Sequence, residues 1–284
     1  MPVYERGYRH WERSGRRAAP AWWAIARRGI AEPIKSRRLL FLLVVAWVPA
    51  IVKGGILYFT FKMGELTRLL GGAWTDITAP GFHEFLKWQS PFVLIVLAII
   101  GANLITKDRR ENGLALYFSR PLGLRDYVAG KGAIIMTYYF SVTLFPIYAL
   151  CIFGYLVTNG ATGLEMLLEI PLRATAYCLL AGAAYALVLL AISALMTRTA
   201  FSVMWWVLLV AGTDALAEIN ALFDARLAVM SFPAQFLNSG TLFFGSTRHI
   251  EGVAPGVSLA MVVLYAAAGW LILRARIRPV EVVS

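Results

Sequence analysis

The sequence predicts an all-α, polytopic membrane protein with six transmembrane helices. Hydrophobic residues make up 59% of the 284 residues, and the mean hydropathy is +0.67. Six apolar runs are each long enough to cross about 30 Å of hydrocarbon, which takes about 20 helical residues. The runs are continuously apolar, whereas the strands of a membrane barrel would alternate over about ten residues. Helices are therefore the predicted spans.

The predicted spans are separated by polar segments and preceded by a basic N-terminal stretch. In chain order they cover residues 39–61, 85–106, 132–157, 171–196, 201–217 and 256–273. For residues 1–20, which lack apolar periodicity, we expect a mobile basic tail, and residues 21–284 then form one six-helix domain. A cleaved signal peptide is not expected, because the first apolar run begins only at Leu39, after a long basic region.

The positions of the cations predict the orientation of the chain. The net charge is +11, and the stretch up to Arg38 holds ten cations, while residues 105–131 hold six and the C-terminal tail holds three. Because Lys and Arg accumulate in cytoplasmic loops, six spans with both termini inside place all these segments in the cytoplasm. Attraction to membrane lipid headgroups is a second role for these cations. A nucleic-acid partner is not expected, since no folded soluble domain presents them.

A short stretch before the first span has the pattern of a helix lying in the headgroup plane. Trp22, Ile25 and Ile30 recur at helical spacing, while Arg27 and Arg28 lie mainly elsewhere around the predicted helix. The alternative is an ordinary basic flank that only holds the orientation of the first span.

Two later regions carry packing signals. The fourth span is rich in Gly, Ala and Ser, which predicts that it packs centrally or at a subunit contact. The outer segment 218–255 is the longest, and we expect either a fifth span that overruns the membrane or a re-entrant or interfacial helix. An apolar helical stripe leads into it, and Phe232-Pro233 and Gly240 are expected to break the chain later. The stripe consists of Leu216, Ile219, Leu222, Phe223, Leu227 and Met230.

The sequence lacks the usual catalytic and cofactor-binding patterns. Gly130-Lys131-Gly132 resembles the end of a phosphate-binding loop, but Arg125 stands where its first glycine belongs, so we expect no ATP hydrolysis by this chain. The three histidines lack metal-ligand spacing, and the two cysteines, Cys151 and Cys178, fit packing positions inside spans. We therefore expect no catalytic residue, bound cofactor or metal in this chain.

The segment between the second and third spans resembles the membrane (permease) subunit of type-2 ABC transporters, the exporter-like ABC permeases. The resemblance rests on Gly101-Ala102-Asn103-Leu104-Ile105, Lys107-Asp108-Arg109-Arg110-Glu111, Gly113-Leu114, Tyr117-Phe118-Ser119-Arg120-Pro121, Arg125-Asp126-Tyr127 and Gly130-Lys131. Thr106-Lys107-Asp108 departs from the many members with a glutamate close after the second span. The acidic role is thus open between Asp108 and Glu111.

This resemblance implies a permease that forms a dimer with a second copy or a paralogue in a bacterial or archaeal cytoplasmic membrane. It also implies two separate ABC ATPase subunits, which hold ATP and Mg²⁺ and dock on the cytoplasmic face. The substrate is not readable. The docking segment comprises Asp108, Arg109, Arg110, Glu111, Gly113, Leu114, Tyr117, Phe118, Arg120, Pro121 and Arg125.

The residues of the docking segment also suggest its local structure. Asp108–Arg110 can start a cytoplasmic helix whose apolar docking face contains Leu114, Tyr117 and Phe118, and Pro121 suits the first turn of a following helix. The alternative is a basic inner loop that only fixes topology.

Three charged residues inside or near the spans are candidates for a transport path. Lys53 lies about fifteen residues into the first run, where it either snorkels to the outer side, the favoured interpretation, or faces the path. Asp214 and Glu218 share a helix face, where they line an exit, bind Arg226, or simply mark the membrane interface, which we favour.

Two other classes of function remain open in the sequence. One is a non-transporting anchoring or mechanotransmission subunit, in which ATP-driven motion acts on an envelope protein. The other is an intramembrane enzyme, which would need polar catalytic groups that converge at one depth in the membrane.

Overall fold

The computed structural model describes residues 20–63, 77–111, 113, 123–158, 163, 165–247, 250 and 252–277. All regular elements within these ranges are helical, and six helical units are long and apolar enough to cross a membrane. These spans are Arg37–Phe61, Ala79–Arg110, Leu124–Val157, Met166–Leu195, Thr199–Ala221 and Pro255–Arg276. The predicted all-α, six-span architecture is therefore confirmed. The predicted mobile tail lies outside the described residues, apart from Pro20.

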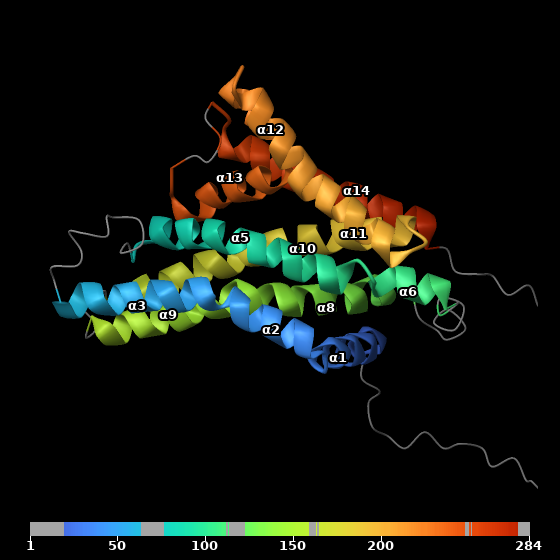
Figure 1. Cartoon of the computed structure of the whole chain (residues 1–284), viewed down its shortest axis with the longest axis horizontal. Coiled ribbons are helices and arrows are strands. Elements are labelled where there is room, and N and C mark those ends of the chain that lie inside the picture. Colours follow the sequence, from blue (N-terminus) through green and yellow to red (C-terminus); the bar gives the residue numbers. More distant parts are fainter. Residues whose placement is uncertain are drawn as a thin grey trace, which may run out of the picture.

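Each of the first three spans is interrupted once. Span 1 consists of α2 (Arg37–Ala46) and α3 (Val48–Met63), span 2 of α5 (Ala79–Gly101) and α6 (Leu104–Arg110), and span 3 of α8 (Leu124–Val142) and α9 (Leu144–Val157). These spans pack against one another along their length, α2 and α3 on α5, and α3 on α9 (Figure 1).

The breaks in spans 1 and 3 are bridged by side chains. The buried Gln89 amide, from α5, donates through Nε2 to the carbonyl oxygens of Ala46 at 2.6 Å and of Val142 at 2.8 Å. Trp47 Nε1 donates to the carbonyl oxygen of Ser141 at 3.0 Å. An interrupted helix leaves carbonyl groups without their usual partners, and a buried carbonyl needs a hydrogen bond. Gln89 and Trp47 therefore stabilise the two breaks together.

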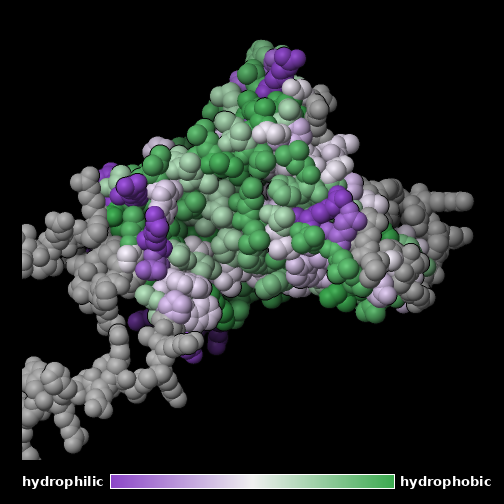
Figure 2. All heavy atoms as spheres, turned by 180° about the vertical axis from the view of Figure 1, so that it is seen from behind, coloured by the Kyte–Doolittle hydropathy of each residue, from purple (hydrophilic) through white to green (hydrophobic). Residues whose placement is uncertain are grey.

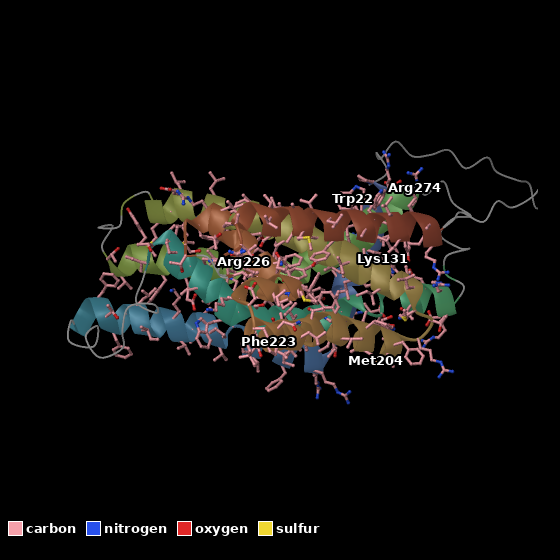
Figure 3. All side chains as sticks on the ribbon, turned by 90° about the horizontal axis from the view of Figure 1, so that it is seen from above. Trp22, Lys131, Met204, Phe223, Arg226 and Arg274 are labelled. Carbon is pink, nitrogen blue, oxygen red and sulfur yellow. The ribbon has the colours of Figure 1, made fainter. Side chains whose placement is uncertain are left out.

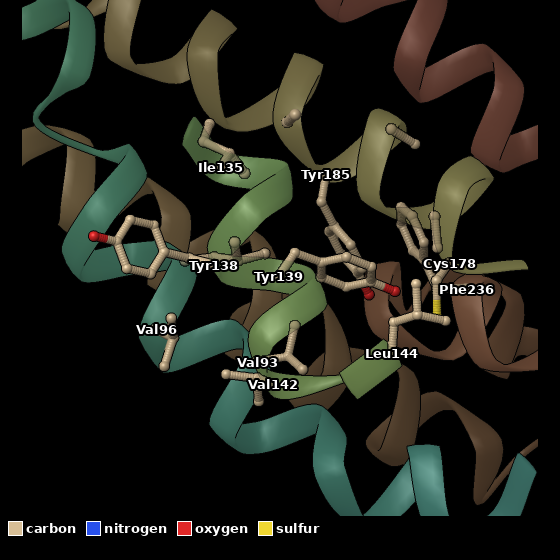
Figure 4. Close-up of a cluster of buried hydrophobic side chains, with 14 of the residues drawn as sticks. Val93, Val96, Ile135, Tyr138, Tyr139, Val142, Leu144, Cys178, Tyr185 and Phe236 are labelled. Atoms are coloured by element: carbon tan, nitrogen blue, oxygen red, sulfur yellow. The ribbon is translucent and has the colours of Figure 1, made fainter. Parts of the chain in front are cut away.

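Span 4 lies at the centre of the bundle, as its small residues predict. It consists of a π-helical turn, η1 (Glu165–Glu169), and α10 (Ile170–Leu195). In its most apolar stretch 67% is buried, against 17–50% in the other spans. Figure 4 shows part of this core, where the ring of Tyr185 stacks on that of Phe236 with centroids 3.9 Å apart. Cys151 and Cys178 are buried and free, which confirms their packing role.

Spans 5 and 6 are joined by a helix that folds back onto the bundle. Span 5 comprises α11 (Thr199–Val207), the π-helical η2 (Leu208–Gly212) and α12 (Thr213–Ala221), and span 6 is α14 (Pro255–Arg276). Between them lie the 3₁₀ helix η3 (Ala225–Met230) and α13 (Phe232–Phe244). α13 packs on α5, α10 and α14, while α12 rises away from the bundle (Figure 1).

The helical path breaks at Ser231, directly before the Phe232-Pro233 pair, as predicted, and this pair begins α13, whereas Gly240 lies inside α13 and does not break it. Ser231 precedes this helix and its hydroxyl accepts the backbone N–H of Ala234 at 3.0 Å. A proline in the first turn has no N–H to leave unsatisfied, so it favours a helix start. The same reasoning applies to α5, which begins at Ala79 and has Pro80-Gly81 in its first turn.

The surface of the described chain is mainly apolar along its middle. Figure 2 shows green side chains over the middle of the molecule, with hydrophilic patches towards its ends and on the projecting tip. Large apolar side chains are exposed on several spans, including Phe41 at 71% and Leu172 at 71%. Their number exceeds what a soluble protein exposes, which supports a multi-pass membrane protein.

Candidate functional site at the ends of spans 2 and 3

The charged segment between spans 2 and 3 begins inside a helix. α6 continues span 2 after a break at Ala102 and Asn103, and Asp108–Arg110 form its last turn. The prediction that these residues start a helix is therefore wrong. Buried Ile105 anchors α6 in the core, and the cations in its last turn interact favourably with the carbonyl end of the helix.

A cluster of buried hydroxyl groups fixes the break before α6. Ser193 Oγ, from α10, accepts the backbone N–H groups of Ile105 at 3.0 Å and Thr106 at 3.1 Å, and it lies 3.1 Å from the carbonyl oxygen of Ala102, to which it donates. The hydroxyl of Thr106 is also 3.0 Å from that of Ser202 in α11. The first amides of a helix lack partners within it, and here a side chain of another span satisfies them. Spans 2, 4 and 5 are thus joined at one point.

A buried ion pair joins α6 to the start of span 3. Lys131 Nζ lies 2.7 Å from Asp108 Oδ2, and the two side chains are 8% and 15% exposed. Tyr127 donates its hydroxyl hydrogen to the same oxygen at 2.7 Å, and Lys131 also donates to the carbonyl oxygen of Leu104 at 3.0 Å. Tyr127 and Lys131 lie in α8, which begins at Leu124, eight residues before the predicted start of span 3 at Gly132.

Two further cations connect α6 to its surroundings. Arg109 donates to the backbone carbonyl of Ala194 at the end of α10. Lys107 Nζ lies 3.1 Å from Glu32 Oε1, and this hydrogen bond lowers the pKa of the exposed Glu32 carboxyl below its ordinary value of 4.5. Arg110 is exposed and lies 3.6 Å from Glu111. α6 is therefore tied to the N-terminal helix as well as to spans 3, 4 and 5.

The predicted interfacial helix, α1 (Ala21–Ile34), packs on α8. Ile25 and Ala26 are buried, while Trp22, Arg27 and Arg28 are exposed. At the crossing, a Cβ atom added to Gly130 would lie 2.8 Å from Ile25 Cβ and 2.9 Å from the carbonyl oxygen of Trp22.

The predicted apolar stripe of α1 therefore contacts protein along part of its length. Farther along the helix, Tyr138 donates its hydroxyl hydrogen to the carbonyl oxygen of Ile30 at 2.8 Å. The side chains of Trp22 and the two arginines remain available for headgroups, and the headgroup position of the helix stays a prediction.

Part of the predicted docking segment lies outside the described residues, namely Leu114, Tyr117, Phe118, Arg120 and Pro121. The apolar docking face and the helix expected after Pro121 therefore stay predictions. The docking residues that the structure describes lie at the two ends of the segment. Gly113 lies next to Asp108, since a Cβ atom on it would be 3.3 Å from the Asp108 carbonyl oxygen, and Arg125 is exposed in the first turn of α8.

Lys53 is buried, which makes the favoured snorkelling interpretation wrong. Its side chain is 1% exposed, and Nζ donates to the carbonyl oxygen of Gly81 at 3.1 Å and lies 5.4 Å from the ring centre of Phe82. The ammonium group thus binds the first turn of α5, and the carbonyl and the ring replace part of its hydration.

Asp214 and Glu218 occupy different environments, although both lie on α12. Asp214 Oδ1 accepts the hydroxyl hydrogen of Ser231 at 2.6 Å, which ties α12 to the start of α13, and Glu218 is exposed. Lys53 lies on α3, which does not pack on α12 (Figure 1). The structure therefore does not place Lys53 beside Asp214 and Glu218 through a contact between their helices. A role of these three charges in transport stays a prediction.

The hydroxyl cluster is not evident from the sequence. In the sequence, Ser193 is one of the small residues of span 4, and Thr106 belongs to a departure from the permease pattern. The available signal was the presence of two polar residues, Ser193 and Ser202, at the ends of apolar runs that flank a short turn. Hydroxyl groups at such positions often satisfy backbone groups of neighbouring helices in membranes.

No model of a known protein family matches this chain, and no curated protein is similar enough to count as a match. The functional assignment therefore depends on the sequence and on the geometry described above.

Proposed function

We propose that this chain is the membrane-spanning permease subunit of an ATP-driven, type-2 ABC exporter. In this proposal the ends of spans 2 and 3 face the cytoplasm, where separate ATPase subunits hold ATP and Mg²⁺, and a second copy or a paralogue completes the transport path. Three sequence features support it. Residues 101–131 resemble exporter-like permeases, Lys and Arg gather in the segments expected in the cytoplasm, and Gly130-Lys131-Gly132 does not complete a phosphate-binding loop.

The observation that carries the proposal is the attachment of α6 to four other elements. Asp108 binds Lys131 in span 3, Thr106 contacts the hydroxyls of spans 4 and 5, and Lys107 binds Glu32 in α1. A loop that only fixes topology needs no such network. An element that receives a push from an ATPase does need one, because force passes between helices only through contacts that hold them together.

The expected mechanism follows from these contacts. Closure of two ATPase subunits around ATP would displace the docking segment and, with it, α6. Because α6 is joined to α8 and to the facing ends of α10 and α11, the ends of spans 2 to 5 would move together. The interruptions at Trp47 and Thr143 offer places where spans 1 and 3 can bend during that movement.

The test is co-purification of an ATPase from the native membrane. We expect the variant Arg109→Glu/Arg110→Glu/Arg120→Glu to lose the ATPase while it inserts normally. The matched control is Arg37→Glu/Arg38→Glu, which reverses exposed charges at the start of span 1, outside the docking segment, and should retain the ATPase. Because Arg109 also binds Ala194, the double variant Arg110→Glu/Arg120→Glu separates lost docking from local unfolding. Retention of the ATPase by the triple variant would refute the proposed docking.

A further inference from the structure

A cleft lies where span 3 begins and span 6 ends. Its volume is about 440 Å³, and two arginines from different helices contribute to its wall. The described residues that line it are Gly123, Leu124, Arg125, Asp126, Trp270 and Arg274. Arg125 is in the first turn of α8 and Arg274 in the last turn of α14. The cleft therefore lies at the level of a membrane surface, where spans enter and leave the hydrocarbon.

Within the described part of the chain, the two guanidinium groups of this cleft outnumber its acidic side chains. Among the described residues, neither Arg125 nor Arg274 has an ion pair or a hydrogen bond from its side chain, and Asp126 is the one acidic residue of the lining. Like charges that share a cleft repel, and an anion between them removes the repulsion. A guanidinium group can bind two oxygens of one phosphate at once, through two parallel N–H···O bonds.

The surface of α14 next to the cleft is apolar and exposed. Leu264 and Leu271 are 58% and 62% exposed, and with Arg274 they follow one face of the helix at spacings of seven and three residues. Arg274 is labelled near the end of this helix in Figure 3. Trp270, partly buried one turn before Arg274, is the type of side chain found at the level of headgroups. A phosphate with acyl chains attached uses both the arginines and this apolar face.

We infer that the cleft binds the phosphate group of an anionic membrane phospholipid, held between Arg125 and Arg274, with an acyl chain along Leu271 and Leu264. A free phosphate ion would share the arginines but leave the apolar face without a role. Basic pockets between spans are known to bind anionic headgroups. The inference does not depend on the proposed function, because it requires neither an ATPase nor a particular orientation of the chain.

The test measures lipid retained by the full chain, purified and exchanged into bilayers of phosphatidylcholine with phosphatidylglycerol, by native mass spectrometry. Each arginine near an anionic surface contributes about fivefold, so Arg125→Gln/Arg274→Gln should weaken the preference for phosphatidylglycerol about 30-fold. The control Arg37→Gln/Arg38→Gln removes two exposed cations at the start of span 1 and should keep the preference. If the double variant does not fold, Arg274→Gln alone should lose about fivefold while Arg274→Lys retains most of it.

Several results would overturn the inference. An equal loss in the control variant would show a general surface effect, and an unchanged preference in the cleft variants would show that the cleft holds no lipid. A third arm adds inorganic phosphate to the protein in phosphatidylcholine alone and, in parallel, in the bilayers that contain phosphatidylglycerol. If the protein binds phosphate there in an arginine-dependent way, and phosphate displaces phosphatidylglycerol completely, the ligand is a free anion. Failure of this test leaves ATPase co-purification unaffected, so the two proposals are distinguishable.

Discussion

The ammonium nitrogen of Lys131 lies 2.7 Å from a carboxylate oxygen of Asp108, and this contact joins the last turn of span 2 to the start of span 3. Both residues belong to the charged segment that interrupts the apolar sequence, yet both side chains are largely buried. Because of this pair, the two ends of the polar segment pack as part of the helical core.

Removal of one member of this pair should destabilise the protein strongly. Asp108→Ala removes the carboxylate that lies 2.7 Å from Lys131 Nζ, and breaking a buried pair typically costs about 3 kcal/mol or more. The measurement is the free energy of unfolding in detergent. Asp108→Leu/Lys131→Met should recover much of the loss, because no buried charge remains. The control Glu111→Gln, in the exposed pair with Arg110, should change stability by less than about 1 kcal/mol. Equal effects at Asp108 and Glu111 would contradict a special role for the buried pair.

The contact between α1 and α8 should depend on a single glycine. Gly130→Ala places a Cβ atom 2.8 Å from Ile25 Cβ and 2.9 Å from the Trp22 carbonyl oxygen, so α1 must shift. Gly132→Ala is a matched control in the same helix, since a Cβ atom there meets nothing within 4 Å. We expect trypsin to cleave after the exposed Arg27 and Arg28 several times faster in the Gly130 variant. Equal cleavage of both variants would show that α1 is not held by this crossing.

The sequence predicted the six spans well because each apolar run is long enough to identify a helix. It placed the start of span 3 at Gly132, eight residues too late, because charges within a span look like loop residues until their partner is known. Asp108 lies 23 positions before Lys131, and no local sequence pattern predicts that contact. The burial of Lys53 is not predictable for the same reason, because its acceptor, the Gly81 carbonyl, lies in another span.

Gln89 should stabilise the interruptions of spans 1 and 3. Gln89→Leu has a similar volume but removes both donated hydrogen bonds, which leaves the carbonyls of Ala46 and Val142 without this donor. We expect a loss of about 1–3 kcal/mol in the free energy of unfolding. Ile95→Val, on the exposed side of the same helix, serves as the control and should change stability little. An unchanged stability in the Gln89 variant would show that the bridges contribute nothing.

The contact between Glu32 and Lys107 should weaken in acid. Because the folded-state pKa of Glu32 lies below the ordinary value of 4.5, the contact stabilises the protein above pH 4.5, and the contribution is lost as the pH falls through the lowered pKa. The measurement compares the unfolding free energy of the wild type with that of Glu32→Gln from pH 6 to pH 3. Their difference should shrink to zero in acid. A difference that stays constant with pH would exclude this ion pair as its source.

The most direct test of the central claim, that residues 105–131 receive the movement of an ATPase, is to purify the unmodified chain from its native membrane and identify what accompanies it. We expect an ABC-type ATPase in equal amount with the chain, and ATP hydrolysis by the purified complex that falls when the charges of the docking arginines are reversed. A chain that purifies without any ATP-binding protein, under conditions that preserve the six-span fold, would refute the proposed role of residues 105–131.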